Sequence, residues 1–240
     1  SGTIQFALVV GGALGDKLLE WDGDYELETV NGFAVSSPAT VNGLPGGNFS
    51  VYNATLLGNT VSGNHGVNIR SQAAVRLVNS LLVNPRSSVI DVDHTTGVSL
   101  NRQATNKFAQ GISKFVGVSA FKTGLNDVTA WVALGGDDAT VRTALGTVAF
   151  ANKFDSASDS NPGLAVLPTT ALSGGQLISV VPNAGTASAG ALDSVFDDGT
   201  FSSNASIVSA LPFRGAFQPG TPELWTSGWT AAAQAGIIQP

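Results

Sequence analysis

The chain has 240 residues, of which only 12% are charged, and it carries a net charge of −6. Eleven scattered lysines and arginines make no basic face, which excludes nucleic-acid binding. The absence of cysteine excludes disulfides and thiolate metal sites, and the absence of an apolar stretch of about 18 residues excludes a membrane-spanning helix.

Composition also indicates the class and location of the protein. The chain contains 29 glycines and no methionine, and it is poor in the charged residues that favour helices. This β-rich, turn-rich composition predicts a secreted chain, extracellular or at the cell surface, from which a signal peptide has been removed.

Residues 1–31 are expected to form an N-terminal strand and cap. The run Ile4–Val10 is apolar and uncharged, so as an exposed strand edge it would recruit another strand. It either covers the first coil of its own chain or is donated to a neighbouring copy. The side chains that would mediate assembly are Ile4, Phe6, Leu8 and Val10.

An acidic patch follows this strand. Asp22 and Asp24 stand close to Glu20 and Glu26 and could supply oxygen ligands for Ca²⁺. The spacing does not match an EF-hand loop, and a solvated acidic face or a contact between chains is the alternative.

Residues 32–121 show an internal repeat. A two-residue apolar alternation returns about every two dozen residues, on two interleaved tracks, and glycine or asparagine marks the corners between them. The first track is Phe49/Val51, Val75/Leu77 and Val98/Leu100, and the second is Val67/Ile69 and Ile90/Val92. Short strands at this spacing cannot bury their apolar face alone, so each turn must stack on the next.

The expected fold is therefore all-β: a right-handed parallel β-helix, or solenoid, forming one domain over residues 1–240. Residues 122–206 are expected to hold a short helical or irregular insertion and further coils. The segment from Asp137 to Leu145 reads as a helix with an acidic start, in which Val141, Ala144, Leu145 and Val148 share one face.

Residues 207–240 form an aromatic tail, in which four residues are expected to close the C-terminal end of the coils as a cap. These are Phe213, Phe217, Trp225 and Trp229. The segments Arg214-Gly215-Ala216-Phe217 and Trp225-Thr226-Ser227-Gly228-Trp229-Thr230 resemble the end of bacterial secreted right-handed β-helix proteins that carry an RGAF…WTxGWT segment. The resemblance covers the coils from about Phe33 and the tail, and implies fold and location but no catalytic motif.

The best catalytic candidates surround Asp91. In a strand, Asp91 and Asp93 project from one face, and the repeat places Arg70 beside Asp93, with His94 adjacent. Such a surface could bind Ca²⁺ and an acidic sugar. The alternative is a cross-strand charge pair on a solvated face.

Together these features predict a non-enzymatic extracellular structural or adhesive protein, whose partner is itself, as in a self-assembling surface fibre. No cofactor is expected apart from possible Ca²⁺. The alternative is a β-helix polysaccharide lyase, a hydrolase or a carbohydrate-binding module, with polysaccharide as the partner.

Overall fold

A computed structural model describes most of the strand-forming part of the chain. The described residues are 2–11, 16–22, 29–30, 33–34, 49–58, 65–70, 73–85, 87–94, 104–121, 131–133, 138–154, 162–164, 178–184, 213–221, 224–236 and 238–239.

Three four-stranded parallel sheets dominate the described chain, and the chain visits them in turn. Sheet A has the order β1 (Gly2–Gln5), β6 (Phe49–Tyr52), β9 (Val75–Val78) and β12 (Lys114–Val116). Sheet B has the order β2 (Leu8–Val10), β7 (Thr55–Leu57), β10 (Leu81–Val83) and β13 (Ser119–Phe121). Sheet C has the order β3 (Lys17–Asp22), β8 (His65–Arg70), β11 (Ile90–Val92) and β14 (Trp131–Ala133).

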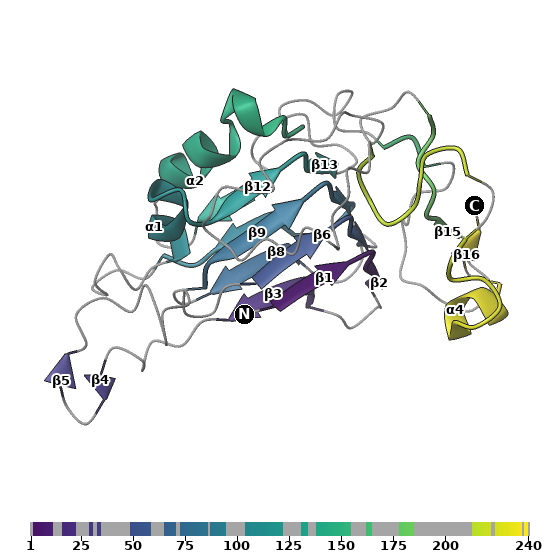
Figure 1. Cartoon of the computed structure of the whole chain (residues 1–240), viewed down its shortest axis with the longest axis horizontal. Helices are drawn as coiled ribbons and strands as arrows, with labels where there is room; N and C mark the ends of the chain where they lie inside the picture. Colours follow the sequence, from purple (N-terminus) through teal and green to yellow (C-terminus); the bar gives the residue numbers. More distant parts are fainter. Residues whose placement is uncertain are drawn as a thin grey trace.

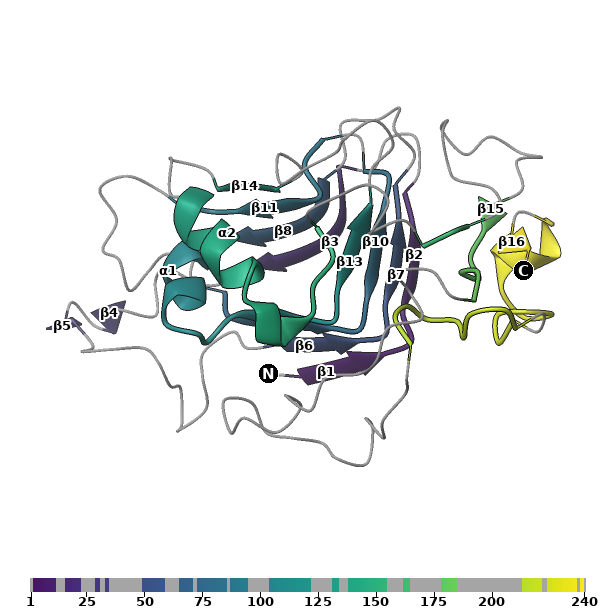
Figure 2. The same cartoon turned by 90° about the horizontal axis from the view of Figure 1, so that it is seen from above.

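The remaining elements are short. They are the helices α1 (Ala104–Ala109), α2 (Asp138–Leu145) and α4 (Ala231–Gln234), the 3-10 helix η4 (Val148–Phe150), the antiparallel pair β4 (Thr29–Val30) and β5 (Phe33–Ala34), and the parallel pair β15 (Ile178–Ser179) and β16 (Ile238–Gln239). In Figure 1, α1 and α2 lie at the β12 end of sheet A, and the N-terminus lies at the β1 end. Figure 2 shows the three sheets as three sides around one interior.

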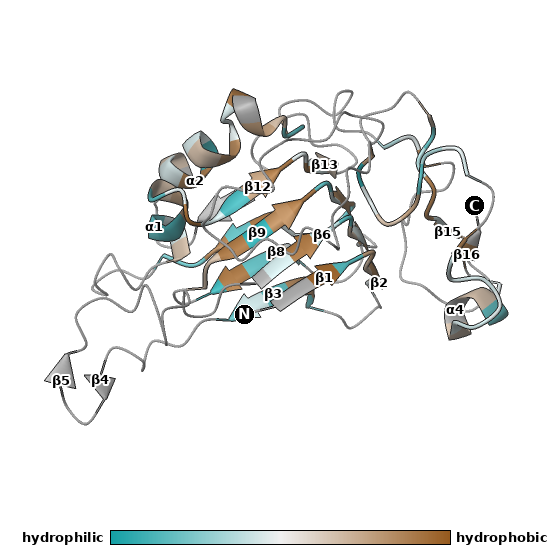
Figure 3. Cartoon of the chain, viewed as in Figure 1, coloured by the Kyte–Doolittle hydropathy of each residue, from teal (hydrophilic) through white to brown (hydrophobic). Residues whose placement is uncertain are grey.

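The predicted register of the central strands is confirmed. Phe49 pairs with Val75, and Val67 pairs with Ile90. The alternate residues point inward, so that Val51 and Leu77 stack in a column with Phe115, each no more than 1% exposed. Burial of each such side chain contributes roughly 1.5–3 kcal/mol relative to exposure. Figure 3 shows the apolar colour along β9 and β12 and polar colour towards several strand ends.

The corner between sheets A and B also repeats. Phe6, Asn53, Asn79 and Gly117 each follow a sheet A strand, and all four have a positive φ, at 59°, 52°, 47° and 62°. Asparagine and glycine tolerate this left-handed backbone. Gly117 is needed for a second reason, since a Cβ there would lie 2.3 Å from Asn79 Oδ1.

The predicted fold class, an all-β right-handed parallel β-helix with a helical or irregular insertion and an aromatic cap, is wrong for the described chain. The strands form three separate parallel sheets plus an antiparallel pair, and helices pack into the core. The regular spacing ends after β11, because α1 intervenes and Arg76 pairs with Lys114 rather than with a residue two dozen positions on. Val98 and Leu100 lie outside the described residues.

Two further expectations need correction. Ile4–Val10 is not one flat strand, because the chain turns at Phe6 from sheet A into sheet B, and hydrogen bonds from Phe6 N to Tyr52 O and from Thr55 N to Ala7 O fix the turn. The predicted helix before residue 146 is confirmed as α2. Val148 does not share its buried face, since it lies in η4 and is 93% exposed.

The predicted fold included an aromatic cap at the C-terminal end of the coils, and this part of the prediction is wrong. The tail does not close the end of the strand stack. Phe213 and Phe217 are buried, but Phe217 packs in a cluster with Leu57 and Leu81 on the side of sheet B. Trp225 and Trp229 are 43% and 65% exposed. The far end of the stack is closed instead by α2, whose Val141 and Leu145 join the core.

Candidate functional site

The polar face of sheet C carries two of the predicted catalytic residues, Arg70 and Asp91. We use this name for Lys17, Glu20, Asp22, His65, Asn68, Arg70 and Asp91. Val67, Ile69, Ile90 and Val92 point into the core, so Asn68, Arg70 and Asp91 point to the opposite face of the sheet. Side-chain contacts join His65 to Asp91 and Lys17 to Glu20 on this face. The register places Glu20, Asn68 and Asp91 side by side on three adjacent strands.

Asp91 is the buried acidic group on this face. Its residue is 4% exposed, and burial raises the pKa of its carboxyl group, although His65 and a hydrogen bond with Asn68 favour the charged form. His65 Nδ1 lies 3.4 Å from Asp91 Oδ2 and 2.7 Å from Ser88 Oγ. Asp91 Oδ1 and Asn68 Oδ1 are buried and make no hydrogen bond. The Asp91 carboxylate therefore contacts His65 and is almost wholly shielded from solvent.

Arg70 and Lys17 form the exposed half of the polar face. Arg70 Nη1 lies 3.4 Å from Glu20 Oε1 and 3.9 Å from Asp22 Oδ2, and the hydrogen bond with Glu20 is the main reason why the pKa of Arg70 is raised. Lys17 Nζ lies 3.0 Å from Asp16 Oδ2 and 3.3 Å from Glu20 Oε1. Each acidic residue of β3 therefore has a cationic neighbour.

The structure brings together only part of the predicted set. Arg70 neighbours Asp93 across the strands, since Asp93 N donates to Ile69 O, 2.8 Å away, and the charge of Asp93 contributes to the raised pKa of Arg70. His94 turns away to α1, where its Nδ1 lies 2.8 Å from Thr105 Oγ1. The four residues therefore do not converge on one point.

His65 was not among the residues predicted from the sequence. The signal was present, because Ser88 follows His65 by 23 residues, the spacing between Val67 and Ile90. That offset places Ser88 beside His65 and Asp91 beside Asn68.

The predicted calcium site receives no support from the described part of the chain. Asp24 lies outside it, and Asp22 is 60% exposed beside Arg70. No group of three or more histidine, aspartate or glutamate side chains that could hold a metal ion occurs among the described residues.

The tail segment, residues 213–217, contacts two successive turns of the chain, the turn that contains β6 and β7 and the turn that contains β9 and β10. Asn53 Nδ2 donates to Phe213 O at 3.1 Å, Gly215 N donates to Asn79 O at 2.7 Å, and Ala216 N donates to Thr55 Oγ1 at 2.9 Å. These bonds satisfy backbone groups that a buried segment cannot leave unpaired. The Arg214–Phe217 part of the tail motif therefore acts as a structural clamp that holds the tail segment along the strand stack.

Arg214 anchors the tail segment to the far end of the stack. Its side chain donates to Ser119 Oγ at 2.8 Å and to Ala151 O at 2.6 Å. The residue is 2% exposed, and burial lowers the pKa of the guanidinium group to about 10. Arg214 stays charged at neutral pH and ties the tail segment to the loop that follows η4.

The buried Phe217 at the end of the tail segment and two exposed tryptophans after it form a stacked array. Phe217 and Trp225 stack with ring centroids 5.5 Å apart and an interplanar angle of 13°, and Trp229 lies 6.0 Å from Trp225. Trp225 Nε1 donates to Ala216 O at 3.1 Å. This array continues the tail segment away from sheet B.

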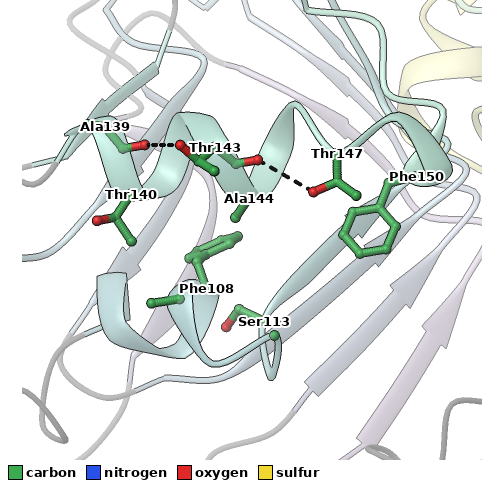
Figure 4. Close-up of a pocket in the computed structure, with 10 residues that line it drawn as sticks. Phe108, Ser113, Ala139, Thr140, Thr143, Ala144, Thr147 and Phe150 are labelled. Atoms are coloured by element: carbon green, nitrogen blue, oxygen red, sulfur yellow. Dashed lines mark hydrogen bonds between the residues drawn. The ribbon is translucent and has the colours of Figure 1, made fainter.

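A groove of about 520 Å³ lies between α1 and α2. Figure 4 shows Phe108 between the two helices and Phe150 at one end of the groove. Two threonine hydroxyls in its wall donate to helix carbonyls, from Thr143 to Ala139 O at 2.8 Å and from Thr147 to Thr143 O at 3.4 Å. No charged side chain is among the described residues that line the groove, and these residues present mainly apolar surface.

The predicted assembly residues lie in the first turn, by which we mean β1, β2 and β3. Ile4 aligns with the buried core residue Val51 but is 42% exposed, and Phe6 is 37% exposed. Leu8 and Val10 pack partly against the cluster that contains Leu57. Among the described residues, Ile4 therefore lies at the uncovered end of the core, whereas Leu8 and Val10 lie on the side of the tail.

No family model, curated protein or solved structure matches the chain. Among the described residues, no helix is both long and apolar enough to span a membrane.

Proposed function

We propose that the chain is a non-enzymatic structural or adhesive protein of the extracellular space that associates with copies of itself through its first turn. One observation carries this proposal. β1, β2 and β3 are the edge strands of sheets A, B and C, so all three parallel sheets end in the same turn.

Edge strands present rows of backbone N–H and C=O groups that recruit further strands unless they are covered or charged. β1 and β2 contain no charged residue, and the charges of the first turn are confined to β3 and the adjoining Asp16. Ile4 and Phe6 add exposed apolar surface at the same edge. Backbone pairing together with apolar contact favours a protein partner.

The extracellular location rests on composition. A chain with 12% charged residues, 29 glycines and no cysteine or methionine suits a turn-rich secreted protein that meets oxidising conditions without reactive sulfur.

The geometry of the polar face argues against a polysaccharide lyase or hydrolase. Asp91 is buried, Arg70 is paired with Glu20, and His94 contacts Thr105 instead of the other candidates. A sugar-cleaving site needs carboxylates that reach the scissile bond from a cleft. These side chains therefore lack the arrangement that a sugar-cleaving site requires.

The experiment is sedimentation equilibrium of the purified chain from about 1 µM to about 1 mM, which spans weak to moderate affinities. The average mass should rise with concentration. Ile4→Lys should keep the mass at that of one chain, because a lysine at an edge opposes pairing. Val148→Lys is the matched control, since Val148 is also an exposed apolar residue but lies at the opposite end.

Substitution is a better test than deletion of the first turn. Removal of β1 and β2 would leave β6 and β7 as new edges of sheets A and B, so association could persist through them. A native chain that stays at the mass of one copy over the whole concentration range contradicts the proposed function.

A further inference from the structure

The two ends of the strand stack are built differently. At the β12–β14 end, Gly117 N donates to Phe150 O at 2.7 Å, and Asn152 Nδ2 donates to Phe115 O, also at 2.7 Å. Ala120 N then donates to Lys153 O at 3.1 Å. Residues 150–153 therefore occupy the backbone edge of β12 and β13.

The core is closed at this same end. α2 packs against β14 and β12, and its Val141 and Leu145 are 0% and 1% exposed. Phe154 joins the same core cluster. Among the described residues, the first turn is thus the one end of the stack where three sheet edges and partly exposed core side chains coincide.

From this asymmetry we infer that the chain forms a closed two-fold pair in which the first turn of one copy meets the first turn of a second copy. The inference rests on the proposed function and names its geometry. A fibre built by end-to-end stacking needs a receptive surface at both ends, and here residues 150–153 cover the edges of β12 and β13 while α2 packs against β14. Two identical ends that meet form an isologous interface, which closes after two copies.

The charges of the first turn fit this arrangement. A two-fold axis across the stack makes facing strands antiparallel, and antiparallel edges form a regular ladder. β3 begins with Lys17 and ends with Asp22, so an antiparallel β3 of a second copy brings Lys17 of each chain toward Asp22 of the other. β1 and β2 carry no charge and can therefore face each other across the interface.

Phe6 provides an independent indication. It occupies the corner at which the later turns have Asn53, Asn79 and Gly117, and it holds a φ of 59° that disfavours a bulky side chain. Strained residues persist where they serve a function. A half-exposed aromatic ring at the open end supplies the kind of anchor found at the centre of protein interfaces.

The size of the interface predicts a moderate affinity. β1, β2 and β3 contribute 4, 3 and 6 residues, fewer than the roughly 20–30 residues a side of a standard stable interface. We therefore expect a pair that dissociates on dilution.

The absence of cysteine makes disulfide trapping a clean test. Ile4→Cys and Phe6→Cys, made separately and oxidised mildly, should each report the contact by forming covalent pairs. Thr147→Cys, at the exposed and sealed end, should remain uncrosslinked. The double variant Ile4→Cys/Thr147→Cys should still stop at two chains.

A second variant separates association from folding. Phe6→Asn should weaken the pair at least about tenfold, which corresponds to about 1.4 kcal/mol. Its denaturation midpoint, measured on the dilute single chain, should not fall, because asparagine suits the left-handed corner better. Unchanged association in Phe6→Asn counts against the two-fold pair.

The outcomes distinguish the two proposals. A native mass that reaches two copies and no more, with covalent pairs from the first-turn cysteines, supports both. A ladder of larger covalent species from the double variant overturns the closed pair and leaves self-association standing. A single-chain mass at every concentration overturns the proposed function itself.

Discussion

Substitution of Gly215 by alanine tests whether the tail segment clamps the strand stack. Gly215 has a φ of +94°, and a Cβ there would lie 2.8 Å from Leu81 Cδ1 and 2.8 Å from Thr55 Oγ1. Both neighbours belong to buried strands and are 0% exposed. The alanine therefore requires either a change in the core or displacement of the tail segment.

Two contributions set the magnitude. A left-handed backbone at a residue with a Cβ costs roughly 1–2 kcal/mol, and overpacking against a fixed core typically costs about 1–3 kcal/mol. Together they predict a loss of about 3 kcal/mol in the free energy of unfolding of Gly215→Ala. For a chain of this size, that loss lowers the melting temperature by about 6–12 °C.

The assay is urea unfolding at a concentration low enough that the chain is single, because association adds apparent stability. Tryptophan fluorescence is a suitable signal, since Trp225 Nε1 donates to Ala216 O within the tail segment. Gly228→Ala is the matched control, because Gly228 has a φ of +82° but open space around a Cβ. It should lose only the backbone contribution. Equal losses in the two variants would refute the close packing of the tail segment on Leu81.

Three further outcomes follow from the structure. Burial raises the pKa of the Asp91 carboxyl group above 3.8, so the folded chain binds the carboxyl proton more tightly than the unfolded chain does. The stability of the native chain therefore falls as pH rises from about 4 through the raised pKa. In urea titrations, Asp91→Asn should be more stable than the native chain at pH 7 and should show no such gain at pH 3. Gly117→Ala should destabilise by at least about 2 kcal/mol because a Cβ would lie 2.3 Å from Asn79 Oδ1, whereas Gly111→Ala, with a similar φ and nothing nearby, should lose about 1 kcal/mol. Arg214→Ala should lose about 2–4 kcal/mol in the same titration, since Ser119 Oγ and Ala151 O lose their charged donor, and Arg214→Lys should recover part of that loss.

The register of the central strands was predictable because it follows from the local sequence pattern. The inward apolar alternation fixes which face is buried, and a regular spacing fixes which residues stack, as in the pairing of Phe49 with Val75. The spacing fails at α1, where an insertion moves the next sheet A strand to Lys114. The sequence repeat alone does not reveal that α1 is inserted between β11 and β12 while β12 still pairs with β9.

The ends of the stack were harder to predict because long-range contacts decide them. The aromatic tail has the composition of a cap, yet Phe217 is buried beside Leu57 and Leu81 on the side of the stack and not at its end. The side chains that close the far end, Val141 and Leu145, were predicted as one apolar face of a helix without a location. Periodicity identifies a face that needs covering, but does not say which surface covers it.

The candidate site shows the same division. The repeat placed Arg70 beside Asp93 because both lie in paired strands, and it would also have placed Ser88 beside His65. It could not reveal that Asp91 is buried or that His94 leaves the sheet for Thr105. Residue type alone suggested an open acidic surface, whereas burial makes Asp91 part of the packing.

The tail segment and the sealed end act as one unit because Arg214 belongs to both. It reaches Ala151 O, within residues 150–153 that occupy the edge of β12 and β13, while Gly215 and Ala216 are hydrogen-bonded to the neighbouring turns. A tail segment that detaches therefore loosens the seal as well as the side of sheet B. By holding the tail segment and residues 150–153 in place, the clamp keeps the backbone edges of β12 and β13 covered. Because the first turn is then the end that can recruit a second copy, the expected assembly is a pair and not a fibre.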